Sequence, residues 1–142
     1  MLKGISPLLS PELLQTLSAM GHGDEIVLAD TNFPGPGLAK RLLRADGIPI
    51  AALLDGILPL FPLDTYDASL IMMAVVPGDP LDRAVEADYM EVSVHHEPGS
   101  PAPVRVERHA FYERAKQAYA IVMTGETRAY GNLILKKGVV RG

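Results

Sequence analysis

Apolar residues recur along the chain in short blocks whose spacing alternates between helical and strand-like patterns. Residues 10–20 begin with Ser-Pro-Glu, a typical helix start, and continue with apolar residues three or four positions apart. Residues 26–29 form a continuous apolar run, which predicts a strand that is buried on both faces. Residues 31–37 are rich in proline and glycine and predict an irregular loop.

The rest of the chain continues this alternation. The apolar spacing predicts further helices over residues 48–60, 81–94 and 110–118. It predicts further strands over residues 41–44, 70–76, 104–106, 119–123 and 132–136. Residues 95–103 hold three prolines and one glycine and predict a surface loop. Strands that alternate with helices predict a layered α/β domain.

Length and composition limit the class of protein. A chain of 142 residues with 48% hydrophobic residues predicts one globular domain. The net charge of -4 argues against nucleic-acid binding, which usually needs a basic patch. The absence of cysteine excludes disulfides, zinc–thiolate sites and thiol nucleophiles. The sequence has neither a signal-peptide pattern nor an apolar run of about 20 residues, so we expect a soluble cytoplasmic protein without a membrane partner.

His22 lies between two glycines at a predicted helix–strand joint, which makes it the main candidate for chemistry. We expect Gly21 to end the helix in a left-handed cap and Gly23 to leave room for the imidazole. An imidazole can give and take a proton near neutral pH. The alternative is a histidine that only caps the helix, and the local pattern alone does not decide between them. We expect Asp24 to orient this loop.

Three further places carry side chains that suit a polar ligand. Asp30 ends a buried strand, where ligands of α/β sheets bind, although a turn-capping aspartate would look the same. The Arg108 guanidinium offers a fork of donors that suits vicinal hydroxyls. The alternative is that Arg108 only forms a surface ion pair with a neighbouring glutamate. Residues 130–132, Tyr-Gly-Asn, can stack on a ring and hydrogen bond, or else simply turn the chain into a strand. Glu126 and Tyr119 are secondary candidates.

Several of these segments, in this order, resemble one known family. They are the opening MLKGISPLLSPELL, GHGDE at residues 21–25, Asp30, FYERA at residues 111–115, TGE at residues 124–126 and YGNLILKKG at residues 130–138. Together they resemble the fucose mutarotase / ribose pyranase family, and its fucose branch in particular. The resemblance covers almost the whole chain.

The resemblance implies a fold, an activity and a set of site residues. The implied fold is one three-layer RbsD-like domain over residues 1–142, with a mixed, mainly parallel sheet flanked by helices. The implied activity interconverts the anomers of L-fucose without any cofactor or metal. His22 would be catalytic, and the sugar would be bound by Asp30, Arg108, Tyr130, Gly131 and Asn132. His109 departs from the aromatic residue that the family usually carries at its position.

The resemblance also implies a ring-shaped homo-oligomer, often a decamer, with sites formed between subunits. We expect part of each site, Tyr130 for example, to reach a neighbouring subunit.

Other functions remain open on the residues alone. A ribose pyranase would act on D-ribose, although Arg108 and the FYERA segment favour fucose. A non-catalytic sugar-binding protein would bind sugar without speeding anomer exchange. A metal hydrolase that uses His22, Asp24 and His95 would retain metal through purification. The pair His95–His96 is interpreted as solvated.

Overall fold

The computed structural model describes residues 1–142 and contains a single six-stranded sheet with the strand order β2-β5-β1-β6-β3-β4. The strands are β1 (Glu25–Ala29), β2 (Leu42–Ala45), β3 (Leu70–Met73), β4 (Val104–Val106), β5 (Ala120–Thr124) and β6 (Leu133–Lys136). The helices are α1 (Pro11–Ala19), α2 (Gly35–Leu38), α3 (Ile50–Ile57), α4 (Arg83–His96) and α5 (Arg108–Gln117).

Five of the six strands run in the same direction. β5 pairs in parallel with both β1 and β2, and β3 pairs in parallel with β4. β6 lies between β1 and β3 and is antiparallel to both. The ends of β1 to β5 therefore define two edges, which we call the carboxyl edge and the amino edge. Residues that precede β6 lie at the carboxyl edge.

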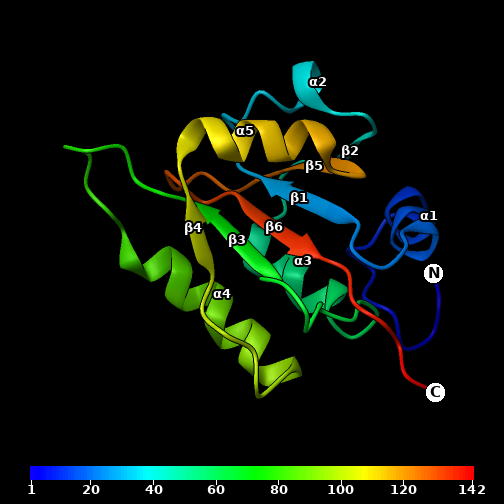
Figure 1. The fold of residues 1–142 in the computed structure, drawn as a ribbon. Helices are drawn as coiled ribbons and strands as arrows, with labels where there is room; N and C mark the ends of the chain where they lie inside the picture. Colours follow the sequence, from blue (N-terminus) through cyan, green and yellow to red (C-terminus); the bar gives the residue numbers. More distant parts are fainter.

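Helices cover both faces of the sheet and give three layers (Figure 1). Alternation along β1 sends Ile26 and Leu28 into a core shared with α1, α3 and α4. Val27 and Ala29 enter a second core, against α5. This arrangement confirms the predicted three-layer α/β domain with a mixed, mainly parallel sheet. None of the helices combines the length and apolar character that crossing a bilayer requires.

The structure corrects three predicted boundaries. The predicted loop over residues 31–37 contains the start of α2, because Pro36 lies in the first turn, where a missing N–H costs nothing. The strand predicted over residues 70–76 ends at Met73. α4 continues through His95 and His96, which were predicted to lie in a loop, because no helix-breaking residue occurs before Pro98.

Candidate functional site

A pocket of about 370 Å³ opens at the carboxyl edge of the sheet. It gathers four of the predicted binding residues from segments far apart in the chain: Asp30 after β1, Arg108 at the start of α5, and Tyr130 and Asn132 before β6. Phe33 and Tyr112 add aromatic walls. The pocket is therefore bordered by charged, amide and aromatic groups, the usual set for a small polar ligand that also has apolar faces. An apolar hollow of similar size along residues 1–14 has no charged side chain in its lining.

Asp30 is held at the floor of this pocket by its neighbours. Its Oδ1 accepts a hydrogen bond from the Asn32 N–H (2.9 Å), and its own N–H donates to Asn132 Oδ1 (2.7 Å). Burial, assisted by the negative charge of Glu126, raises the pKa of the Asp30 carboxyl above its usual range, although hydrogen bonds oppose the shift. Because the Asn132 oxygen accepts from the backbone, its amide N–H groups can donate to the Asp30 carboxylate, which lowers the Asp30 pKa, and to a ligand.

Tyr130 has an unusual backbone conformation, with φ +56° in the left-handed region. Its phenolic oxygen accepts a hydrogen bond from the Val76 N–H (3.2 Å), and its hydroxyl donates to Asp79. The next residue, Gly131, leaves no room for a side chain, because an added Cβ would lie 2.9 Å from the Arg128 carbonyl oxygen. Gly131 therefore shapes the turn, although it is not part of the pocket lining.

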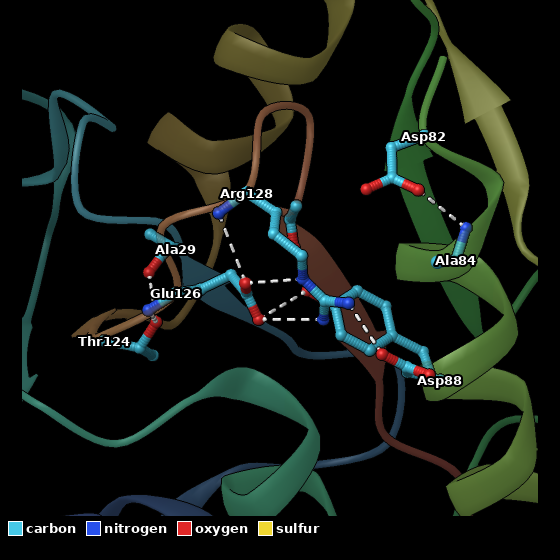
Figure 2. A network of polar contacts seen from close by, with 9 residues as sticks. Ala29, Asp82, Ala84, Asp88, Thr124, Glu126 and Arg128 are labelled. Atoms are coloured by element: carbon cyan, nitrogen blue, oxygen red, sulfur yellow. Dashed lines mark hydrogen bonds and ion pairs between the residues drawn. The ribbon is translucent and has the colours of Figure 1, made fainter.

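A partly buried polar network supports the segment that carries Tyr130 and Asn132. Figure 2 shows the Arg128 side chain between two carboxylates. Its Nε lies 2.9 Å from Glu126 Oε2, and its Nη1 lies 2.6 Å from Asp88 Oδ2 on α4. The Tyr89 hydroxyl, also on α4, donates to the Gly131 carbonyl (2.6 Å). Burial alone would raise the pKa of Glu126, but the hydrogen bonds and charge of Arg128 hold it below its usual range. Glu126 is thus a structural anion behind the pocket.

His22 lies at the opposite, amino edge of the sheet. Its loop is fixed by the Gly21 N–H, which donates to Asp24 Oδ2 (2.7 Å), as expected of Asp24. Gly23 has φ +87°, a conformation that disfavours any other residue.

The prediction of a left-handed cap at Gly21 is wrong. α1 ends at Ala19, and its C-cap residue Met20 has an extended conformation. The Lys137 ammonium donates to the carbonyls of Leu17 (2.8 Å) and Met20 (2.6 Å), and so satisfies the free end of the helix.

His22 forms a pair with Asp64, a residue that our interpretation of the sequence did not single out. His22 Nε2 lies 3.2 Å from Asp64 Oδ1, with the imidazole 48% exposed and the carboxylate only 2% exposed. Burial would raise the pKa of Asp64, but hydrogen bonds from two backbone N–H groups and from His22 hold it below its usual range. A buried, ionised carboxylate behind an exposed imidazole is an arrangement that orients the ring and fixes which of its nitrogens faces solvent.

The remaining candidates lie elsewhere. Tyr119 is at the amino edge, where its ring stacks under the Arg41 guanidinium (3.9 Å). Arg108 belongs to the first turn of α5 and joins none of the ion pairs of the chain. His109 does not line the pocket. His96 pairs with Asp55 (2.8 Å), and no group of three or more His, Asp or Glu side chains is placed to hold a metal ion.

Comparisons with known proteins match nearly the whole chain and point to one family. The model of the RbsD / FucU transport protein family matches residues 3–140. An L-fucose mutarotase from Histophilus somni (strain 2336) is 57% identical over 140 residues, which cover 98% of this chain and 97% of that protein.

Two solved structures are similar in fold and sequence. The fucose mutarotase from Streptococcus pneumoniae, solved in complex with L-fucose, has a TM-score of 0.92 and 50% identity, covering 99% of this chain and 100% of that one. FucU from Bifidobacterium longum has a TM-score of 0.93 and 44% identity, covering 98% and 100%.

Proposed function

The chain belongs to the RbsD / FucU family, and from this membership we propose that it is an isomerase that interconverts the α and β anomers of L-fucose. The observation that carries the proposal is the pocket at the carboxyl edge. It presents hydroxyl-binding groups and aromatic walls in a chain 50% identical to a fucose mutarotase that was solved with L-fucose.

We assign sugar binding to Asp30, Arg108 and residues 130–132. The Asp30 carboxylate can accept hydrogen bonds from sugar hydroxyls, and the Arg108 guanidinium and the Asn132 amide can donate to them. The aromatic walls suit the apolar face of a pyranose. Arg108 is free for this role, because no carboxylate of its own chain pairs with it.

We assign proton transfer to His22, which Asp64 holds and which has one ring nitrogen left to reach a sugar. Within one chain, this pair cannot reach the pocket. β1 separates the two edges, and its five residues span roughly 16 Å at about 3.3 Å per residue. We therefore propose that each site is formed by two subunits, one of which supplies His22 and Asp64 and the other of which supplies the pocket.

A closed ring of identical subunits, such as a decamer, would complete every site in this way. The apolar residues that stay exposed near the two ends of the chain, such as Leu2 and Val140, are consistent with contacts between subunits. We also propose a cytoplasmic location, with which a cysteine-free chain is compatible.

The reaction needs two proton transfers at one hemiacetal. His22 gives a proton to the ring oxygen while the bond between C1 and the ring oxygen breaks, and a second group takes the proton of the anomeric hydroxyl. The open-chain aldehyde then rotates about the C1–C2 bond. Closure on the other face of the carbonyl, with both protons returned, yields the other anomer. General acid–base catalysis of this kind typically speeds a reaction by about 100- to 10,000-fold.

Saturation-transfer NMR between the two anomeric protons of L-fucose tests the proposal directly. We expect the wild-type protein to speed exchange, and His22→Ala to lose about 100-fold or more of that acceleration while it remains folded. His95→Ala is the matched control, because it removes an imidazole that neither lines the pocket nor pairs with Asp64. Full activity of His22→Ala would contradict the assignment of His22.

The same measurement on D-ribose separates the alternatives. Faster pyranose–furanose exchange of D-ribose than anomer exchange of L-fucose would identify a ribose pyranase. Saturable sugar binding without faster exchange of either sugar would identify a non-catalytic binding protein.

A further inference from the structure

Asp79 is a carboxylate of the pocket that the sequence did not single out. It lies in the segment between β3 and α4, at the carboxyl edge, and lines the same pocket as Asp30, Arg108 and Tyr130. In Figure 1 this segment projects beyond the sheet before the chain enters α4. Asp79 reaches back from it to accept the hydrogen bond of the Tyr130 hydroxyl.

The hydrogen bonds of the Tyr130 phenol leave it only one way to contact a ligand. A phenol has one O–H to donate and two lone pairs that can accept. The O–H is donated to Asp79, and one lone pair accepts from the Val76 N–H (3.2 Å). The remaining lone pair can only accept. With Asp79 ionised, Tyr130 therefore presents an acceptor to a sugar hydroxyl, not a donor.

The position of the phenol is fixed from two directions. The backbone of Tyr130 has φ +56°, a conformation that residues other than glycine adopt only where the surroundings impose it. The Val76 N–H holds the oxygen from the β3–α4 segment. The other titratable or charged groups in the pocket lining are Asp30, Arg108 and Tyr112. Among these groups, only Asp79 accepts a hydrogen bond from the Tyr130 hydroxyl.

We propose that Asp79 is the final proton acceptor opposite His22 and that it acts through the phenol of Tyr130. This inference rests on the proposed mutarotase function and supplies the second group that the reaction needs. Asp79 is thus a positioning and relay residue, because the sugar contacts Tyr130.

The step balances in protons and electron pairs. The anomeric O–H bond breaks and its proton passes to the phenolic oxygen, while the proton of Tyr130 passes to Asp79. The electron pair of the anomeric O–H becomes the second bond of the aldehyde C=O. The bond between C1 and the ring oxygen breaks, and its electron pair takes the proton of His22. Ring closure reverses every transfer, so the enzyme returns to its starting state.

Asp79→Asn separates proton acceptance from mere positioning. Asparagine has the same shape and keeps an oxygen that accepts from the Tyr130 hydroxyl, but the amide does not take up a proton. We expect Asp79→Asn and Asp79→Ala both to lower kcat for L-fucose exchange by about 100-fold, the lower end of general-base effects, with KM nearly unchanged. Asp79→Glu, which keeps a carboxylate, should recover much of kcat.

Asp82→Asn is the matched control in the same segment. Asp82 caps α4 by accepting from the Ala84 N–H (3.0 Å), a role that asparagine fills equally well. We expect wild-type kcat and KM from it.

The outcomes distinguish this inference from the proposal on which it rests. If Asp79→Asn keeps kcat within about threefold of wild type, the carboxylate only positions the phenol and the inference is overturned, while the mutarotase function stands. If the wild-type protein does not speed L-fucose exchange at all, both are overturned.

Discussion

Asp30 and Asp64 are both buried carboxylates, yet their surroundings shift their pKa values in opposite directions. Burial is the largest influence on each and raises the pKa. At Asp30 burial prevails, with help from the charge of Glu126. At Asp64 two backbone N–H groups and His22 outweigh it. The negative charge of Asp64 therefore stabilises the fold, whereas a negative charge on Asp30 destabilises it.

Asp30→Asn should raise the melting temperature at neutral pH and weaken L-fucose binding. The folded-state pKa of Asp30 is raised, so its ionised form destabilises the fold above that pKa, and this cost disappears below the unfolded pKa of about 4. The stability gain of the variant should therefore shrink as the pH falls from 7 toward about 4. Thermal unfolding across this range measures it, and a variant less stable than wild type at pH 7 would contradict the argument.

Single residues could be predicted from the sequence where a local pattern marks them. His22 is marked by its glycines, and Asp30 by its place after an apolar run. Asp64 has no such mark, because it lies 42 positions from His22 and reaches it only through tertiary structure. A bridge between Leu63 and Lys137 places it there. Asp79 was missed for the same reason.

At the scale of elements, α4 supports the segment that precedes β6. Tyr89 donates to the Gly131 carbonyl. Asp88, its neighbour on the same turn of α4, pairs with Arg128 (Figure 2). The binding segment is therefore held by a helix as well as by its own loop. A loop tied to a rigid element loses less freedom when a ligand binds, which favours affinity.

Tyr89→Phe should test this support. The substitution removes the donor to the buried Gly131 carbonyl, and an unsatisfied buried acceptor costs about 1–3 kcal/mol of unfolding free energy. We expect that loss in denaturant titrations, together with a higher KM for L-fucose, because residues 130–132 become less fixed.

Tyr119→Phe is the control, since its ring keeps its stacking on Arg41 and no hydrogen bond of its hydroxyl is present. Equal effects of the two substitutions would argue against a specific role of α4.

The helices and strands were largely predictable, but their arrangement was not. The apolar runs of β1 and β5 predict strands that are buried on both faces. Such runs give no preference for one neighbour over another, so the insertion of antiparallel β6 between β1 and β3 could not be deduced. The sequence also placed the start of α5 too late, at residue 110. The helix begins at Arg108, because its N-cap Glu107 follows β4 immediately.

At the scale of the whole molecule, the two halves of the proposed site lie on opposite edges of one sheet. His22→Ala and Arg108→Ala chains should each be inactive alone. When the two chains are co-expressed and assemble at random, roughly a quarter of the sites should combine an intact His22 with an intact Arg108, because the contact is heterologous. Recovery of exchange activity in the mixed oligomer, measured by the same NMR method, is the expected result.

Mixing the two proteins after separate assembly is the control, since closed oligomers keep their own subunits. Absence of recovery in the co-expressed oligomer would mean that each chain builds its site alone.

Because the two half-sites lie at opposite ends of the short strand β1, a defective chain affects more than one site of such an assembly. Every copy serves two sites at once, one through each end of that strand. A copy defective at both ends disables both of the sites that it shares with its neighbours, while each neighbour keeps the site on its other side. Activity should then fall as the square of the intact fraction, so that a small share of faulty chains removes nearly twice that share of the activity.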